Sequence, residues 1–209
     1  MAMKTWWLYV TAVFVISATP GPNMLHVMVQ SIQHGPRRAL ASMAGLMTAN
    51  LICLVASALG LGALLKASPG LFDALRYAGV AYLLWLGIKA WRAPVGVGVG
   101  EGAAMPATRR SLRVLYATGL GTGLSNPKLI VFAAALLPQF IDVSRPFVPQ
   151  LAVLVVTFMA IEVFWFGIYA TGGRSLSRWL APANRQRLFN RVTGALFIGF
   201  GAALLGSRG

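Results

Sequence analysis

Two short stretches decide the fold of this chain: Thr19-Pro20-Gly21-Pro22-Asn23 and Ser125-Asn126-Pro127-Lys128. Each stretch interrupts a long apolar run, one in each half of the sequence. A proline ring removes one backbone donor and clashes with the carbonyl four residues earlier. We therefore predict that Pro20, Pro22 and Pro127 break two helices, and that the breaks free the carbonyls of Ile16, Ala18 and Gly123.

The surrounding composition indicates a membrane protein. Of the 209 residues, 57% are hydrophobic and 11% are charged, whereas a soluble domain has roughly 45–50% apolar and 25% charged residues. A membrane-spanning helix needs roughly 20 apolar residues, and six windows are near or above that length: 6–33, 40–65, 71–91, 115–140, 147–172 and 188–205. The sequence thus predicts an all-α polytopic membrane protein with six transmembrane helices, the first retained rather than cleaved as a signal peptide.

The two proline clusters fall in the first and fourth of these helices, where the middle of the bilayer would lie. Backbone groups cannot stay unpaired in hydrocarbon, so a broken helix at this depth is buried in protein or lines a wet cavity. A matched pair of broken helices in the two halves of a chain points to a transport site.

The distribution of basic residues predicts how the chain lies in the membrane. A net charge of +14 would suggest nucleic-acid binding in a soluble protein. Six spans instead put five basic residues on one side (Lys4, Lys66, Arg76, Arg145, Arg208) and twelve on the other (Arg37, Arg38, Lys89, Arg92, Arg109, Arg110, Arg113, Arg174, Arg178, Arg185, Arg187, Arg191). The richer side is cytoplasmic. We therefore expect periplasmic termini, contacts with membrane lipids and no nucleic-acid partner.

A linker divides the chain into two halves. Residues 93–111 contain alternating Gly and Val between prolines, which is typical of a flexible segment. It separates a first three-helix half, 1–92, from a second, 112–209. Because three is odd, the halves enter the membrane in opposite directions, as an inverted repeat requires. Pro20 follows Trp6 by 14 residues and Pro127 follows Arg113 by 14 residues, so both breaks reach a similar depth.

Two charged residues lie inside the predicted spans near these breaks. Lys128 directly follows Pro127, where its ammonium and the free amides of a half-helix suit a carboxylate. The alternative is a lysine that reaches toward one membrane interface. Glu162 lies at a similar depth in the fifth span, and it can pair with Lys128, bind an ammonium, or take up a proton. We expect removal of the Lys128 ammonium to abolish transport and to leave stability near normal.

Three asparagines complete the predicted site. Asn23 and Asn126 flank the prolines and can cap the half-helices or contact a substrate. Asn50, in the second span, corresponds in position to Glu162 and can act as an interhelical hydrogen-bond partner. His26 follows the first break by one turn, and packing or capping is its favoured interpretation.

Metal and cofactor chemistry have little support in the sequence. Cys53 is the one cysteine, and the two histidines have no carboxylate nearby in sequence, so we expect no metal site and no cofactor. Small residues recur at helix-packing spacing, as at Gly119 and Gly123, and they favour close packing within the bundle or in a homodimer.

Five segments in order carry a resemblance to a known family: the 20–23 break, the basic turn at 35–38, residues 45–50, the 125–128 break and residues 190–204. With these, the chain resembles the LysE/RhtB family of bacterial amino-acid exporters over essentially its whole length. The resemblance implies export of amino acids or their derivatives across the inner membrane, driven by the proton gradient. It also implies that Pro20, Gly21, Pro22, Asn23, Asn126, Pro127 and Lys128 line the transport site.

One residue departs from the family pattern. Asn50 stands where many members carry an aspartate, and an amide cannot titrate. This departure makes Glu162 the expected coupling residue and makes basic substrates less suitable.

Several functions were weighed against these residues. The favoured one is a secondary exporter of a small neutral amino acid, in which Lys128 binds the carboxylate and Glu162 binds the ammonium or the coupled proton. Export of a divalent cation is an alternative with few ligands to support it. An intramembrane enzyme would need paired acid and base groups or an activated nucleophile, and a cytoplasmic scaffold would not need prolines within the membrane.

Overall fold

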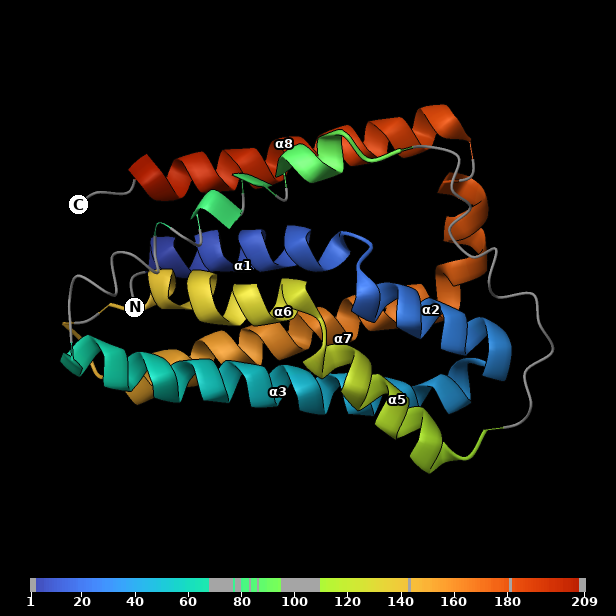
Figure 1. Ribbon diagram of the computed structural model, residues 1–209, viewed down its shortest axis with the longest axis horizontal. Coiled ribbons are helices and arrows are strands. Elements are labelled where there is room, and N and C mark those ends of the chain that lie inside the picture. Colours follow the sequence, from blue (N-terminus) through green and yellow to red (C-terminus); the bar gives the residue numbers. More distant parts are fainter. Residues whose placement is uncertain are drawn as a thin grey trace.

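The computed structural model describes residues 3–67, 77, 80–82, 84, 85, 87–94, 110–142, 144–180 and 182–206. The first half contains α1 (Met3–Ala18), α2 (Pro22–His34) and α3 (Pro36–Ala67), followed by a short apolar helix, Val80–Trp91. The second half contains α5 (Leu112–Leu124), α6 (Pro127–Val131), a π-helical turn η2 (Phe132–Leu136), a 3₁₀ turn η3 (Leu137–Phe140), α7 (Phe147–Leu180) and α8 (Ala183–Gly206). Figure 1 shows these helices side by side along one long axis.

Both predicted helix breaks are present. α1 and α2 meet at an angle of 50° across residues 19–21, and α5 meets the segment that begins at Pro127 at 52°. Each second half-helix starts with proline at its first position, where the missing amide would have no helical partner in any case. The prolines therefore both end one helix and begin the next.

The long helices are those of a polytopic membrane protein. Residues Pro36–Gly60 of α3 and Phe147–Gly172 of α7 are long and apolar enough to cross a membrane, and each bent pair is as well when taken as one span. Residues 71–76, 78, 79, 83 and 86 of the predicted third span, 71–91, and most of the 93–111 linker lie outside the described residues. The six-span inverted repeat stays a prediction.

Figure 1 shows α1 beginning and α8 ending at the same end of the bundle. The turn between α2 and α3 and the turn between α7 and α8 lie at the opposite end. The described chain thus begins and ends on the same side of the bundle, as an even number of membrane crossings would require.

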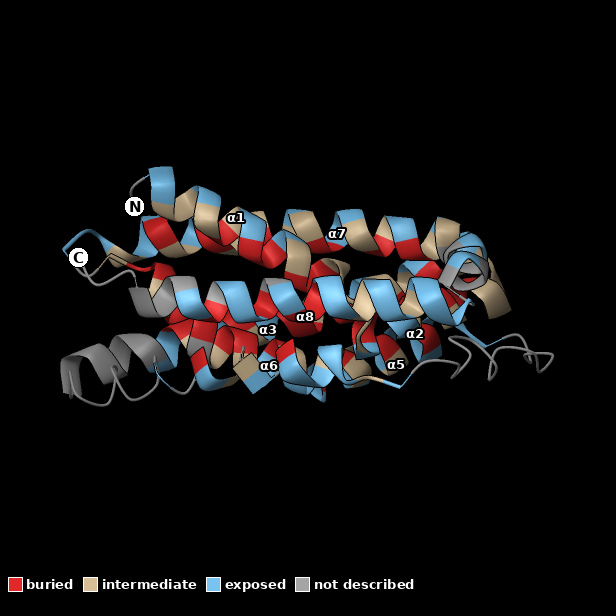
Figure 2. Cartoon of the chain, turned by 90° about the horizontal axis from the view of Figure 1, so that it is seen from above, coloured by how far each residue is buried: buried red, intermediate tan, exposed pale blue. Residues whose placement is uncertain are grey.

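The outward faces of the helices are apolar. Large exposed side chains line α3 (Leu51, Ile52, Val55, Leu59) and α7 (Val153, Val156, Val163, Phe164). Figure 2 shows the exposed residues along the outer sides of the bundle and the buried ones between the helices. An apolar surface of this extent is a liability in water but suits contact with lipid.

Small residues let α3 and α5 pack closely. A methyl group added at Gly119 would overlap the Ser42 carbonyl, and one added at Gly45 would overlap the Tyr116 carbonyl. The predicted packing role of Gly119 and Gly123 is confirmed, since Gly123 likewise touches Ala49. Gly45, which the sequence did not single out for packing, is the matching position on α3. The α3–α5 contact fixes the half-helix that leads into the second break.

Two apolar clusters flank the breaks. One includes Tyr9, Val13, Leu137, Phe140 and Leu154, from α1, η3 and α7. The other includes Met24, Val27, Met28, Leu46, Phe166 and Tyr169, from α2, α3 and α7. The polar residues of both breaks lie between the two clusters.

Candidate functional site

The carbonyls freed in the first break are satisfied by side chains from distant helices. The Lys128 ammonium of α6 donates to the carbonyl oxygens of Ile16 and Thr19, the latter at 3.1 Å. The Tyr169 hydroxyl of α7 donates to the Ala18 carbonyl at 2.8 Å. The predicted loss of the helical partner at Ala18 is thus compensated by a tertiary contact, whereas the Ile16 carbonyl accepts both from Lys128 and from the Thr19 amide, the latter at 3.3 Å.

The second break is satisfied by its own residues. The Asn126 amide donates to the Gly123 carbonyl at 3.1 Å, and the Ser125 amide donates to the Gly121 carbonyl at 3.0 Å. The Asn126 side chain accepts from the Lys128 amide at 3.0 Å, which is the predicted N-cap. Asn23, by contrast, lies inside the first turn of α2, and Gly21 occupies the N-cap position without a side-chain cap.

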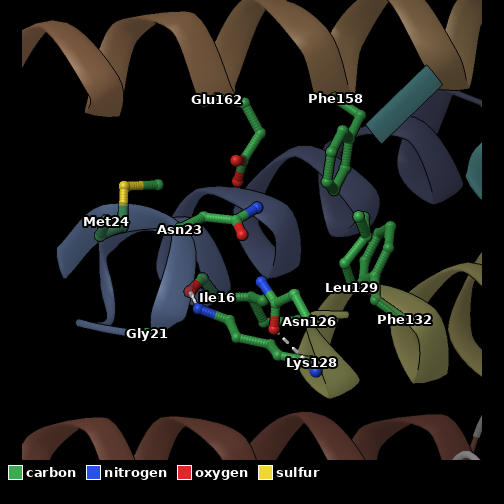
Figure 3. Close-up of a pocket in the computed structure, with 10 residues that line it drawn as sticks. All are labelled: Ile16, Gly21, Asn23, Met24, Asn126, Lys128, Leu129, Phe132, Phe158 and Glu162. Atoms are coloured by element: carbon green, nitrogen blue, oxygen red, sulfur yellow. Dashed lines mark hydrogen bonds between the residues drawn. The ribbon is translucent and has the colours of Figure 1, made fainter. Parts of the chain in front are cut away.

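A pocket lies where the two breaks meet. Its polar lining comes from Gly21, Asn23, Asn126, Lys128 and Glu162, and its apolar lining from Ile16, Met24, Leu129, Phe132 and Phe158. Figure 3 shows Glu162 entering from α7 on one side and Lys128 from α6 on the other, with Asn23 between them. The pocket therefore has one cationic side, one anionic side and an apolar wall.

Hydrogen bonds connect Glu162 directly to α1 and α3, and through Asn50 to α2. The Ser17 hydroxyl of α1 donates to Oε1 at 2.6 Å, and Asn50 Nδ2 of α3 donates to Oε2 at 3.3 Å. Asn23 Nδ2 of α2 then donates to Asn50 Oδ1 at 3.4 Å. The side-chain oxygen of Asn23, Oδ1, is buried and has no hydrogen-bond partner among the described residues.

Lys128 and Glu162 line the same pocket without forming an ion pair. The ion pair found in the described part of the chain joins Arg145 and Asp142, in the turn before α7. Lys128 has three N–H donors, and two of them are directed to Ile16 and Thr19. One donor of Lys128 and the carboxylate of Glu162 are thus open to a ligand that carries both charges.

The structure places the nine predicted site residues in three groups. Gly21, Asn23, Asn126, Lys128 and Glu162 line the pocket. Pro20, Pro22 and Pro127 shape the backbone of the breaks. Asn50 lies one hydrogen bond behind Asn23 and is fully buried.

Two further polar side chains near the breaks, His26 and Tyr169, are not among the pocket-lining residues. The two ring nitrogens of His26 are hydrogen-bonded to the hydroxyls of Ser42 and Thr122 at 2.6 and 3.2 Å, so this residue links α2 to α3 and α5. Tyr169 packs in the apolar cluster around Met24 and donates to the Ala18 carbonyl of the first break.

Sequence reasoning missed the apolar wall and Ser17. Phe158 precedes Glu162 by one helical turn and Phe132 follows Lys128 by one turn, so helical spacing from the two charged residues would have found both. Ser17 is a lone hydroxyl in the apolar run before the first break. Its spacing from Pro20 gives no signal that it faces Glu162, because the partner lies 145 positions away in sequence.

Together, the fold and the site define a multi-pass membrane protein whose two broken helices meet at a small charged pocket. Residues 14–208 match the family described as LysE type translocator. The chain belongs to this LysE/RhtB family, as its proline motifs indicated.

Named relatives cover nearly the whole chain. The homoserine/homoserine lactone efflux protein of Salmonella typhimurium is 36% identical over 208 residues, covering 100% of this chain and 99% of the relative. An uncharacterized membrane protein of Vibrio cholerae is 32% identical over 208 residues, covering 98% of each chain. The leucine efflux protein of Enterobacter is 31% identical over 201 residues, covering 95% of this chain and 93% of the relative. No solved structure matches.

Proposed function

We propose that this protein is a secondary transporter that exports a small neutral amino acid, or a derivative of one, from the cytoplasm. The observation that carries the proposal is the pocket between the two breaks, which joins Lys128, Glu162 and an apolar wall. The names of the relatives, efflux proteins for homoserine or its lactone and for leucine, support the same class of substrate.

The cationic side of the pocket would bind the substrate carboxylate. The third N–H of Lys128 is available for this contact, because the other two donate to Ile16 and Thr19. Asn126 adds an amide group on the same side, since its Oδ1 is engaged by the Lys128 amide while the residue still lines the pocket. Charge-assisted hydrogen bonds of this kind are short and strong.

The opposite side would bind the substrate ammonium. Asn23 Oδ1 supplies an unpartnered acceptor, and Glu162 supplies the negative charge. Because Glu162 is the one carboxylate among the lining residues, a second positive charge on the substrate would find no partner. The pocket thus favours a neutral side chain over a basic one.

The apolar wall would contact the side chain of the substrate. Met24, Leu129, Phe132 and Phe158 form most of it. Homoserine and leucine both place a short, uncharged side chain there. The proposed activity is transport rather than catalysis, because nothing in this pocket pairs a nucleophile with a base.

Proton coupling is assigned to Glu162. It is buried, with 6% of its surface exposed, and it is the pocket residue that can change charge by gaining a proton. In proteoliposomes, Glu162→Gln should not accumulate labelled substrate in response to a pH gradient, and the slower exchange that remains should no longer depend on pH. Accumulation by this variant would exclude Glu162 as the coupling residue.

The two halves are proposed to rock around the breaks as inverted repeats in the bacterial inner membrane. Both termini would then face the periplasm, and the 93–111 linker the cytoplasm. A reporter that works only outside the cytoplasm should be active when fused after residue 208, and activity of a cytoplasmic reporter there would reverse this orientation.

The experiment that tests the function is an efflux assay with a panel of labelled amino acids. Cells that make the protein should release homoserine, homoserine lactone or leucine faster than cells that lack it, with lysine and arginine unchanged. Equal efflux of all panel members with and without the protein would contradict the proposal.

A further inference from the structure

Two hydrogen bonds connect Glu162 to the pocket through Asn50 and Asn23. The carboxylate determines which group donates in each of them. An ionised carboxylate only accepts hydrogen bonds, so Asn50 must turn its NH₂ group toward Glu162 Oε2, as the 3.3 Å contact has it. The Asn50 oxygen then faces Asn23 and accepts from Nδ2 at 3.4 Å. The oxygen of Asn23 is therefore the atom left over at the pocket end.

This leftover oxygen is an unusual feature for a buried side chain. Asn23 is 6% exposed, lines the pocket, and has no partner for Oδ1 among the described residues. Leaving such an acceptor unpaired costs about 1–3 kcal/mol. A ligand that donates a hydrogen bond from within the pocket, such as an ammonium group, would remove that cost.

A proton on Glu162 would exchange donor and acceptor in both hydrogen bonds, from Glu162 to Asn50 and from Asn50 to Asn23. A protonated carboxyl can donate its O–H to Asn50 Oδ1 once the Asn50 amide turns over. Asn50 Nδ2 then points at Asn23 and requires an acceptor, so the Asn23 amide turns as well and presents its NH₂ group to the pocket. Both amides can make this half-turn because their terminal torsions are broad and roughly two-fold.

We infer that Asn50 and Asn23 form an amide relay that carries the protonation state of Glu162 to the substrate ammonium. With Glu162 ionised, the pocket wall offers an acceptor and the ammonium binds. With Glu162 protonated, the wall offers a donor and the ammonium is repelled. The inference rests on the proposed export function and assigns Asn50 and Asn23 as positioning residues for coupling.

The protons balance in each cycle. A proton from the outer medium forms an O–H bond on Glu162, which neutralises the carboxylate and releases the substrate outside. The same proton leaves Glu162 on the cytoplasmic side, where the ionised carboxylate restores the first orientation of both amides. The amide groups only rotate and exchange no protons, so one proton enters for each amino acid exported.

The groups around Glu162 allow this carboxyl to be the switch. Its neighbours on α1, α2 and α3 are Ser17, Asn23 and Asn50, none of which titrates near neutral pH. Among the described residues, the charged group that faces it is Lys128 of α6, held by two carbonyls. Two further titratable residues turn elsewhere: His26 of α2 contacts Ser42 and Thr122, and Tyr169 of α7 donates to Ala18.

A substitution of Asn50, the middle residue of the relay, tests the inference. Asn50→Leu keeps the size of the side chain and removes both hydrogen bonds. Reconstituted in acid-loaded vesicles with labelled homoserine or leucine outside, the variant should exchange substrate yet lose pH-driven accumulation. Ser57→Ala is the matched control, because Ser57 also lies on α3 and donates one interhelical hydrogen bond, to the Ala133 carbonyl, away from the pocket. The control should accumulate substrate as the wild type does.

A second variant covers the case in which Asn50→Leu does not fold. Asn23→Ala removes the acceptor at the pocket end and should weaken substrate binding about tenfold, the value of one charge-assisted hydrogen bond of roughly 1.5 kcal/mol. In exchange assays, wild-type affinity should fall as the pH falls, whereas the affinity of Asn23→Ala should fall much less over the same pH range. A purely structural role of Asn23 would leave the pH dependence at its wild-type size.

The outcomes separate the relay from the function on which it rests. Wild-type protein that moves no amino acid would overturn the proposed function and the relay together. Wild-type transport combined with full pH-driven accumulation by Asn50→Leu, or with an unchanged pH dependence in Asn23→Ala, would overturn the relay alone.

Discussion

The two helix breaks differ in the groups that hydrogen-bond to their backbone carbonyls. Across residues 19–21, the carbonyls of Ala18 and Thr19 accept from Tyr169 and Lys128, which belong to α7 and α6. Across residues 125–126, most of the hydrogen bonds come from the backbone and side chain of Asn126, and their partners lie within the same break. The first break therefore depends on the tertiary structure, whereas the second is held by its own sequence.

This difference suggests different roles in transport. A locally capped break is a stable platform, and the close contact between α3 and α5 fixes it further. A break held by side chains from other helices can change when those side chains move. Because Lys128 both stabilises the first break and faces the pocket, a substrate carboxylate that binds it also acts on that break.

The largest effect is expected for Lys128→Met, which removes the ammonium that donates to the first break. The variant should abolish transport, and it should also lower the free energy of unfolding by about 1–3 kcal/mol, because a carbonyl of the first break loses its partner. This revises the expectation from sequence that stability stays near normal. Lys128→Arg keeps the charge but not the compact ammonium and should restore stability more than transport. Thermal unfolding in detergent and efflux assays measure both, and an equally stable Lys128→Met protein would show that the first break needs no tertiary support.

The rigidity of the second break can be tested at Gly119. In Gly119→Ala, the new methyl group would overlap the Ser42 backbone, and overpacking of this kind costs about 1–3 kcal/mol. Gly121→Ala is the control, since a methyl group there meets nothing within 4 Å and alanine favours the helix. Equal unfolding temperatures for the two variants would contradict the close α3–α5 packing.

A smaller effect is expected for Tyr169→Phe. The change removes the hydroxyl that donates to Ala18 at 2.8 Å and keeps the aromatic ring in its cluster. Stability should fall by about 0.5–1.5 kcal/mol. If the first break is the mobile one, exchange rates should change while the preference among substrates stays the same. A changed substrate preference would place Tyr169 at the pocket instead.

The smallest effect on stability is expected for Gly21→Ala. Its backbone angle, φ −143°, suits any residue, and the added methyl group would lie 3.5 Å from Lys128 Cδ in ordinary contact. Stability should therefore stay within about 0.5 kcal/mol, as for substitutions without a special structural role. The methyl group narrows the pocket beside Lys128, where the substrate carboxylate would bind, so leucine efflux and homoserine efflux should fall to a similar extent. A loss confined to leucine would show that the substrate side chain, and not the carboxylate, contacts this position.

Much of the site followed from the sequence alone. The prolines at 20, 22 and 127 determined where the helices break and which carbonyls lose their partners, since that effect is local to the chain. The apolar windows determined a helical membrane protein, because each backbone group in hydrocarbon must be paired within its own segment. Lys128 and Glu162 stood out because charges within such windows are rare and costly.

Which of these groups contact one another depends on the way the helices pack. Lys128 and Glu162 line one pocket without forming an ion pair, and the Ser17–Glu162–Asn50–Asn23 row joins four helices. No local rule links residues so far apart in the chain, because their contact depends on the crossing of helices that close packing sets. The positions of the breaks and of the charges can be read from the chain, whereas the packing of α1, α2, α3, α6 and α7 sets what those charges contact.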